Sequence, residues 1–248
     1  MKRTVSILLC ILLLSVLSAA SSEPVHLSDD LTGKVTLPFF PDEPSSAGYC
    51  FSYCYPHIDE QDPSAEAINN YYDYQISNAL DFEIPMLADY YASENIDTNR
   101  NITYRLTCNN GYWFSVLICT EEAGHTSYAG NTFAREDTKS DSTVSLPYLL
   151  GILDKNEDDT WLQERQTEKA DRLIREIVWD SVCLNPENIE YYPYVNETYL
   201  ADTFYPEDDF FLDETGTPVF YLQPGDAAPE EYGLITFPIP LDVIRDEM

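Results

Sequence analysis

The stretch from Phe204 to Leu241 limits the fold more than any other part of the chain. Within it, two apolar runs, Phe210–Leu212 and Val219–Leu222, flank a short polar segment, Asp213–Thr217. The glycine of that segment, Gly216, can adopt the positive φ that a tight turn needs. The pattern therefore predicts a β-hairpin.

A further strand is expected after a loop from Pro224 to Gly233. Its apolar residues recur at every second position, the period of a strand with one buried face, and they are Ile235, Phe237 and Ile239. Two intervening residues, Pro238 and Pro240, have no N–H to donate to a neighbouring strand. We therefore expect this strand at the edge of a sheet.

Two long helices are expected upstream of the hairpin. The first begins at Asp62, a capping residue followed by a first-turn proline, and breaks or kinks by Pro85. Its inward stripe has helical spacing and comprises Ile68, Tyr72, Ile76 and Leu80. The second helix covers residues 160–183, where Thr160 and Gln163 match a capping box. Its inward stripe comprises Ala170, Leu173, Ile174, Ile177 and Val178.

Strands are expected between and before these helices. Residues 102–107 alternate between apolar and polar, Asn109–Gly111 is a hairpin turn, and Tyr112–Thr120 returns as a more deeply buried strand. Tyr49–Tyr55 is another buried strand. A loop is expected after residue 120, with a weaker strand near residues 132–135. This order predicts the α+β class, with a mostly antiparallel sheet and the two main helices packed on one face.

The N-terminus has the pattern of an export signal. Lys2 and Arg3 precede an apolar run from Val5 to Leu17, and the small residues after it suit cleavage behind Ala20. We expect residues 1–20 to be a signal peptide; retention as an N-terminal anchor is the alternative. No later stretch of the sequence is apolar enough to span a bilayer, so we expect no membrane span after cleavage.

The remaining chain is expected to form one domain. Residues 21–46 are polar and contain prolines, so we expect a spacer with at most a short strand near Val35–Leu37. The chain has 248 residues, of which 44% are hydrophobic, enough for one sizeable core and short for two. We therefore expect a single α+β domain over residues 47–248, secreted or held at the cell envelope.

Export would permit disulfides, yet no pairing follows from the sequence. The five cysteines of the expected mature chain are Cys50, Cys54, Cys108, Cys119 and Cys183. Cys50 and Cys54 would lie about 13 Å apart along one strand, beyond the roughly 7 Å Cα limit for a disulfide. Cys108 and Cys119 lie on successive strands but far out of register. At least one thiol is unpaired or pairs with another chain.

The charge balance excludes some partners. With 44 acidic residues against 13 lysines and arginines, the net charge is -31. Simple electrostatics therefore argues against binding to nucleic acids or anionic membranes. A cationic partner and plain solubility both account for such acidity.

Motifs for catalysis or metal binding were not found in the sequence. The three histidines, His26, His57 and His125, are far apart and do not form a zinc motif. Neither a nucleophile elbow nor a phosphate-binding glycine loop occurs. Carboxylate pairs are inevitable among so many acids, so they do not identify a glycosidase. We expect no enzyme activity, no metal and no cofactor.

Three landmarks resemble the extracytoplasmic domain shared by RsiV-type anti-sigma factors and PdaC-type peptidoglycan deacetylases. They are Tyr55-Pro56 with Ile68-Asn69, the run from Thr132-Phe133 to Leu146–Leu150, and the region from Phe210 through Ala227–Pro229 and Gly233 to Phe237–Pro240. The resemblance covers roughly residues 49–245. Where the family usually has a Thr-Gly turn, this chain has Asp137–Thr143, so that hairpin is expected to differ.

The resemblance implies a binding module. Only four residues precede Val5 and none follows Met248, so we expect neither the sigma-binding segment of the receptors nor the catalytic domain of the deacetylases. In the receptor branch the domain resembles a binder of lysozyme, which is typically cationic and would be attracted by an acidic partner. Two alternative functions remain. The first is a glycan-binding accessory domain for peptidoglycan, with exposed tyrosines as stacking platforms. The second is an unrecognised carboxylate-dependent hydrolase.

The resemblance and the local chemistry together indicate the loop from Pro224 to Tyr232 as the partner-binding site. Loops held by a rigid sheet commonly carry recognition residues. Pro229 stiffens the backbone, Glu230 and Glu231 supply negative charge, and Tyr232 offers an aromatic anchor. The alternative is a connecting loop whose tyrosine packs inward.

Overall fold

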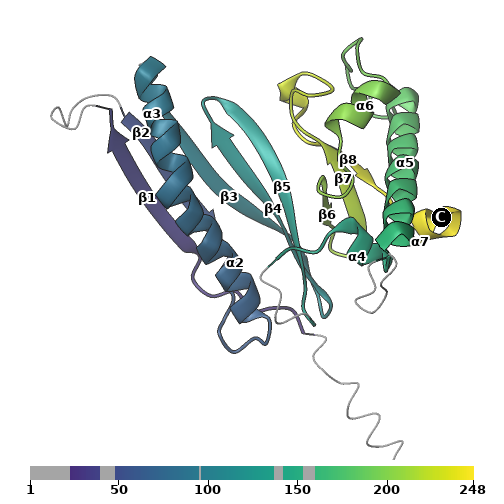
Figure 1. Ribbon diagram of the computed structural model, residues 1–248, viewed down its shortest axis with the longest axis horizontal. Coiled ribbons are helices and arrows are strands. Elements are labelled where there is room, and N and C mark those ends of the chain that lie inside the picture. Colours follow the sequence, from purple (N-terminus) through teal and green to yellow (C-terminus); the bar gives the residue numbers. More distant parts are fainter. Residues whose placement is uncertain (1–22, 40–47, 95, 137–141, 153–159) are drawn as a thin grey trace, which may run out of the picture.

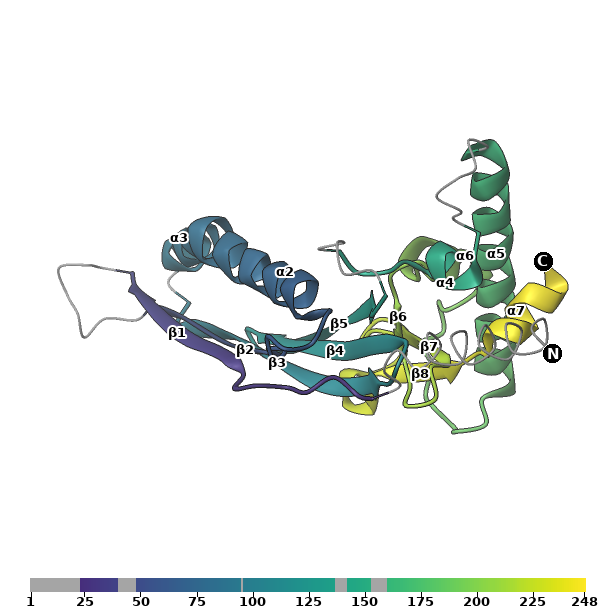
Figure 2. The same cartoon turned by 90° about the horizontal axis from the view of Figure 1, so that it is seen from below.

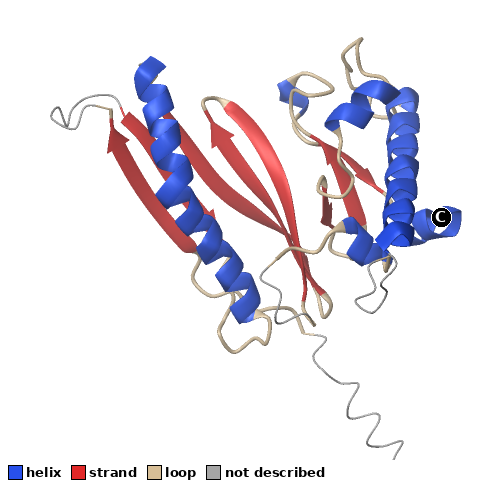
Figure 3. Cartoon of the chain, in the orientation of Figure 1, coloured by secondary structure: helices blue, strands red, loops and turns tan. Residues whose placement is uncertain are grey.

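The computed structural model describes residues 23–39, 48–94, 96–136, 142–152 and 160–248. The expected signal peptide and most of the segment Asp137–Thr143 lie outside these ranges. The described chain forms two β-sheets and several helices (Figure 1, Figure 3). The α+β class is confirmed.

The first sheet has five strands in sequence order. They are β1 (Leu31–Pro38), β2 (Gly48–Tyr55), β3 (Thr98–Asn109), β4 (Trp113–Glu122) and β5 (His125–Ala134). Only β2 and β3 pair in parallel, and the other neighbours are antiparallel, so the mostly antiparallel sheet is confirmed. A parallel pair requires a crossover connection, and a long helix between β2 and β3 provides it.

That crossover helix runs through Pro85, where the sequence had indicated a break. It consists of α2 (Ala65–Asn78), a π-helical turn η1 (Ala79–Glu83) and α3 (Ile84–Glu94). In the π turn the Ile84 N–H donates to the Ala79 carbonyl, five residues back. This wider turn lies immediately before Pro85, whose ring would otherwise clash with the carbonyl of the preceding turn. Of the break or kink that we expected by Pro85, the break is therefore wrong, and the helix has a local π turn before this residue instead.

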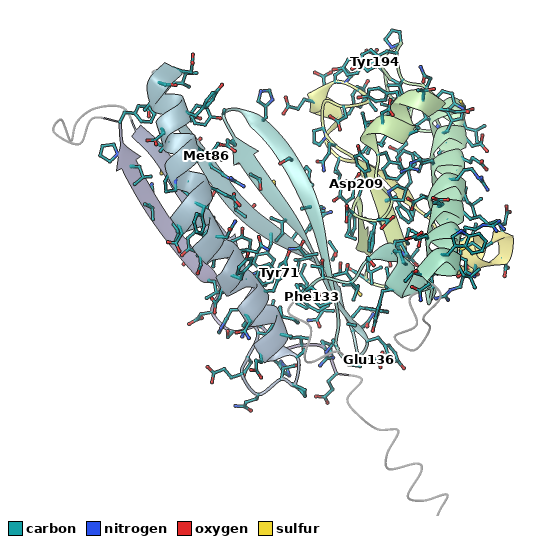
Figure 4. The ribbon with its side chains drawn as sticks, viewed as in Figure 1. Tyr71, Met86, Phe133, Glu136, Tyr194 and Asp209 are labelled. Atoms are coloured by element: carbon teal, nitrogen blue, oxygen red, sulfur yellow. The ribbon has the colours of Figure 1, made fainter. Side chains whose placement is uncertain are left out.

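The crossover helix packs on one face of the first sheet and forms the first core (Figure 2). The fully buried members include Ile68, Tyr72, Ile84, Tyr49, Phe51, Phe114 and Val116. Ile68 and Tyr72 are buried as predicted, whereas Ile76 and Leu80 are only half-buried. Figure 4 shows Tyr71 beside Phe133, and their rings meet edge to face with centroids 5.3 Å apart.

The second sheet contains the predicted hairpin and the predicted edge strand. Its strands are β6 (Phe210–Leu212), β7 (Pro218–Leu222) and β8 (Ile235–Pro238), in that order. In β8 buried and exposed residues alternate, and the strand lies at the sheet edge, so both predictions are confirmed. In β6 and β7, by contrast, every residue is buried.

Buried residues on both faces mean that the second sheet is covered on two sides. On one side lies α5 (Thr160–Leu184), whose most buried residues are Ala170, Ile174, Val178 and Val182. These form the second core with the inward residues of the second sheet and with three short helices, α4 (Leu146–Leu150), α6 (Glu197–Thr203) and α7 (Leu241–Glu247). The helix itself is confirmed, but Leu173 and Ile177 of the predicted stripe are half-buried.

On its other side the second sheet packs against the first sheet. Leu117 of β4 contacts a group from the second sheet, Phe211, Val219 and Tyr221. Val116 and Ile118, the residues before and after Leu117, belong to the first core. Successive side chains of a strand point to opposite faces, so the interface lies on the other face of the first sheet.

The two main helices therefore do not share a sheet face, contrary to our expectation. The crossover helix covers the first sheet and α5 covers the second, with the two packed sheets between them (Figure 2). The continuous apolar runs in β6 and β7 indicate that the second sheet is covered on both faces, because a strand buried on both faces lacks the alternation of apolar and polar residues. The described residues form two main cores, with a smaller apolar cluster between the sheets, rather than the single core that we expected.

The sheets approach closely where β5 crosses β6. A Cβ placed on Gly130 would lie 1.7 Å from the Phe210 carbonyl oxygen, so only glycine fits this backbone contact. Nearby, the buried hydroxyls of Ser115 and Thr132 are 2.9 Å apart, and the Leu212 N–H donates to the Ser115 hydroxyl at 3.1 Å. Hydrogen bonding of these buried polar groups fixes the position of one sheet on the other.

Two segments contribute longer strands to the first sheet than the short strands that we expected near Val35–Leu37 and residues 132–135. Part of the expected spacer, residues 21–46, forms the edge strand β1, and Val25 is buried with its backbone bonded to the Asn109 side chain at 2.7 and 2.9 Å. The expected loop after residue 120 is instead a hairpin into β5. Its two-residue turn, Ala123–Gly124, has positive φ at both positions, as tight hairpins require.

Candidate functional site

The loop between β7 and β8 is a fixed structure at one end of the molecule (Figure 1). A short 3-10 helix, η2 (Glu230–Tyr232), follows Pro229. The Tyr232 N–H donates to the Pro229 carbonyl at 3.0 Å, and the Gly233 N–H donates to the Glu230 carbonyl at 2.9 Å. Ala227 and Ala228 are buried, so they hold the base of the loop.

The loop is also bonded to the outer edge of β5. The Glu230 carboxylate accepts the Thr126 N–H at 3.2 Å and lies 3.8 Å from His125 Nδ1, with which it pairs when His125 is protonated. Glu230 therefore holds the loop against the hairpin turn between β4 and β5. Its role in the described structure is to position its neighbours in η2.

The same edge of β5 is capped by two more side chains from the C-terminal half. Gln223 Oε1 accepts the Tyr128 N–H at 2.9 Å, and Gln223 Nε2 donates to the Tyr128 carbonyl at 2.7 Å. The Gly130 N–H donates to the Tyr221 hydroxyl at 3.0 Å. With Glu230, these side chains satisfy alternate amides of an edge strand, groups that would otherwise remain open to pairing.

Tyrosines surround the other side of the loop. The rings of Tyr192 and Tyr194 stack with centroids 5.1 Å apart, and Tyr199 meets Tyr194 edge to face at 5.2 Å. The hydroxyls of Tyr194 and Tyr199 both donate to the Asp226 carbonyl, at 3.4 and 2.7 Å. Figure 4 shows Tyr194 at this end of the molecule, where its side chain is 52% exposed.

The four candidate partner-binding residues are thus brought to one surface. Tyr232 is 38% exposed rather than packed inward, Glu231 is exposed, Glu230 is exposed but bonded to β5, and Pro229 is half-buried at the start of η2. Tyr194 joins them through its contact with Asp226, although it is far away in sequence. We call Tyr194, Asp226, Glu231 and Tyr232 the loop surface.

Two carboxyl groups of the C-terminal half have raised pKa values. Burial raises the pKa of Asp209 to about 6; an N–H from Tyr205 opposes this, and Asp208 and Asp226 add to it. Burial likewise raises the pKa of Asp171 to about 6, with Glu207 contributing. Such values suit a general acid. A cavity of about 560 Å³ beside α5 and α6 is lined by neither of these two carboxyl groups.

Other chemistry in the described ranges is limited. No group of three His, Cys, Asp or Glu side chains there could hold a metal ion. The five cysteines of the expected mature chain are free thiols. In the β3–β4 register Cys108 lies opposite Ser115 and Cys119 lies opposite Thr103, so the predicted offset between the two cysteines is confirmed. None of the helices described is long and apolar enough to cross a membrane.

The landmarks of the family resemblance have structural roles in this chain. Ile68 lies in the first core, and the Asn69 side chain bonds to both backbone groups of Ile58 at 2.8 and 2.9 Å. Thr132 belongs to the hydroxyl pair between the sheets. Ile68, Asn69 and Thr132 therefore support the fold rather than a binding site.

The fold defines an α+β protein with two packed sheets, and comparison with known proteins finds one family model that matches part of the chain. Residues 143–242 match the family described as "Protein of unknown function (DUF3298)". The matched residues contain the second sheet and α5. The match is to DUF3298 alone. It is consistent with the expected resemblance to RsiV-type and PdaC-type proteins but does not show that resemblance directly.

Solved structures of this family are similar over nearly the whole chain. A DUF3298 family member from Bacteroides fragilis has a TM-score of 0.53 and 11% identity, with 90% of this chain and 94% of that chain covered. A DUF3298 family protein from Pseudomonas aeruginosa has a TM-score of 0.47 and 10% identity, with 88% and 92% covered. The chain matches no curated protein. At these identities the likeness concerns the fold alone.

Proposed function

We propose that this protein is a non-catalytic binding module that works outside the cytoplasm and recognises a cationic protein of the lysozyme kind. The observation that carries the proposal is the loop surface, where two exposed tyrosines and two carboxylates lie on a rigid support. Exposed aromatic residues held by a fixed backbone lose little conformational entropy on binding, which suits them as anchors.

The charge around the loop surface supports a cationic partner. From Asn185 to the C-terminus, Arg245 is the only basic residue, whereas acidic residues recur throughout. A surface of one sign attracts an oppositely charged protein and speeds the encounter. The choice of lysozyme among cationic proteins rests on the resemblance to RsiV-type receptors.

The test is binding of lysozyme to the Tyr232→Ala variant. Loss of an exposed anchor should weaken binding by about 1–3 kcal/mol, while thermal stability stays close to that of the wild type. Tyr112→Ala is the matched control, since Tyr112 is 77% exposed in the turn between β3 and β4. The affinity is measured by isothermal calorimetry at low salt.

Two results would contradict the proposal. If Tyr232→Ala lowers stability as much as affinity, the residue acts in packing. If the wild type does not bind lysozyme at micromolar concentration, lysozyme is not the partner.

Recognition of cell-wall glycan is the second candidate function, favoured by the exposed rings of Tyr194 and Tyr205. Aromatic rings stack on sugars without needing charge. Salt separates the two functions: association with a cationic protein should slow steeply as salt rises, whereas stacking on a neutral sugar should barely change.

A further inference from the structure

The outer face of the crossover helix carries large apolar side chains that the first core does not use. Phe82, Met86 and Tyr90 are 70%, 67% and 58% exposed. They follow one another at intervals of four residues, which places them on one helix face. Figure 4 shows Met86 on this helix. Tyr74, before the π turn, is 66% exposed.

Each exposed aromatic residue on this helix directly follows an aspartate. The pairs are Asp73-Tyr74, Asp81-Phe82 and Asp89-Tyr90, at intervals of eight residues, and all six side chains are exposed. Over one α-helical stretch, eight residues rise about 12 Å. The helix thus presents acid–aromatic pairs at regular intervals, which we call the acid–aromatic stripe, with Met86 between the second and third pairs.

The helix has no positive charge of its own. Residues 65–94 contain no lysine, arginine or histidine, and their acidic residues are Glu66, Asp73, Asp81, Glu83, Asp89 and Glu94. One of these carboxylates, Glu83, pairs with Arg100 at 3.2 Å. The three aspartates of the stripe have no ion pair in the described structure.

Packing does not explain the stripe. The inward face of the helix is complete without it, because Ile68, Tyr72, Ile84 and Ala88 are buried against the first sheet. A helix face turned to water ordinarily carries polar residues, and a row of large apolar ones marks an interaction surface.

The alternation of acid and aromatic side chains matches one kind of ligand group. A guanidinium or ammonium placed over an aromatic ring gains a cation–π contact. The aspartates lie about 100° around the helix from the rings that they precede, so they form ion pairs with other cations of the same partner. A second copy of this helix or an anionic bilayer would instead meet like charge.

We propose that the acid–aromatic stripe is a docking surface for an arginine- and lysine-rich face of a partner protein. This inference deepens the proposed function, since it rests on a cationic partner, and it adds a contact surface separate from the loop surface. The partner's cations lie over the rings of the stripe, and its apolar side chains cover Met86.

The experiment compares binding of a fluorescent oligoarginine peptide by fluorescence anisotropy. One variant carries Phe82→Gln, Met86→Gln and Tyr90→Gln, and another carries Asp73→Asn, Asp81→Asn and Asp89→Asn. Tyr112→Gln is the control for an exposed aromatic residue elsewhere. Thermal midpoints verify that each variant is folded, which we expect because all the changed residues are exposed.

The ring variant should bind the peptide roughly tenfold more weakly than the control, because it loses the two rings of Phe82 and Tyr90 that make cation–π contacts. The aspartate variant should also bind roughly tenfold more weakly, because it loses three carboxylates that pair with the cations of the peptide. Binding within about twofold of the control would overturn the inference. So would light scattering that shows a wild-type dimer and a monomeric stripe variant, since a second copy would then cover the stripe.

Lysozyme serves as a second probe and separates the two proposals. If the wild type binds the peptide through the stripe but does not bind lysozyme, the proposed function fails and the stripe remains a cation-binding surface. If lysozyme binds and both stripe variants bind the peptide like the control, the proposed function stands and the stripe inference fails.

Discussion

At the scale of single residues, Asp209 couples the fold to pH. Its carboxylate accepts the Tyr205 N–H at 2.8 Å, just before β6, in a partly buried place beside other carboxylates. Burial and those neighbours disfavour the charged form, so the pKa rises to about 6 from an ordinary value of 3.8. The folded chain therefore binds a proton more tightly than the unfolded chain.

This raised pKa gives the pH dependence a definite sign. Between about pH 4 and pH 6 the folded state holds more protons than the unfolded state, so stability falls as pH rises through this window. Asp209→Asn keeps an acceptor for Tyr205 and removes the titration. The variant should lose less stability between pH 4 and pH 7 than the wild type, as measured by urea unfolding.

The exposed Asp242→Asn is the matched control for removing one charge from an acidic chain. It should leave the shape of the pH profile unchanged. A constant difference in stability between Asp209→Asn and the wild type at every pH would contradict the assignment.

At the scale of elements, the edge of β5 depends on side chains rather than on another strand. Gln223 bonds to both backbone groups of Tyr128, and Tyr221 accepts from Gly130. We expect Gln223→Ala to speed hydrogen exchange at the Tyr128 amide, because that N–H loses its partner. The inner amides of β4 should exchange as slowly as before.

Nuclear magnetic resonance at single-residue resolution measures this exchange. Glu231→Ala provides the control, since Glu231 is exposed on the same loop. If the Tyr128 amide exchanges at the same rate in both variants, a group other than Gln223 holds this edge.

Elements that depend on local pattern could be predicted from the sequence. The hairpin around Gly216, the edge strand β8 and the helix α5 follow from turn residues and periodicity within each segment. The helix through Pro85 could not be predicted, because its continuation depends on a π turn that tertiary packing stabilises. The start of β5 was missed because Ala123, an unusual residue at positive φ, conceals the turn.

The candidate site also has a part that could be predicted from the sequence and a part that could not. The loop was predictable from its proline, its acids and its tyrosine. Its neighbour Tyr194 and its support by β5 were not, because those contacts join residues far apart in sequence.

At the scale of the whole molecule, two cores meet through a small interface. Phe211 is central to it: its ring stacks near Tyr221 with centroids 6.2 Å apart, and the Arg105 guanidinium lies 5.9 Å from its centre. This arrangement was not predictable, because it requires a contact such as that of Gly130 with Phe210. The interface determines whether the cores unfold together.

Tryptophan reports on only one of the two cores. Trp113 and Trp179 pack against the second core and Trp161 lies on α5, whereas the first core contains tyrosines such as Tyr49 and Tyr72. Phe211→Ala should cost about 3–5 kcal/mol and separate the unfolding curve followed by tryptophan fluorescence, which reports on the second core, from the curve followed by far-ultraviolet circular dichroism, which reports on both. In the wild type, the two curves should coincide.

The exposed Tyr112→Ala should leave these curves coincident and unshifted. Curves that shift together in Phe211→Ala would mean that the cores remain one cooperative unit without this ring.

The prolines of β8 have a consequence for how copies of this protein behave at high concentration. An open sheet edge can recruit the same edge of another molecule and extend into fibrils. Pro238 lies within β8 and Pro240 just beyond it, so an incoming strand would lack amide donors there. The first sheet ends at the edge strand β1, which contains no proline except Pro38, its last residue. Any growth of fibrils should therefore start from β1.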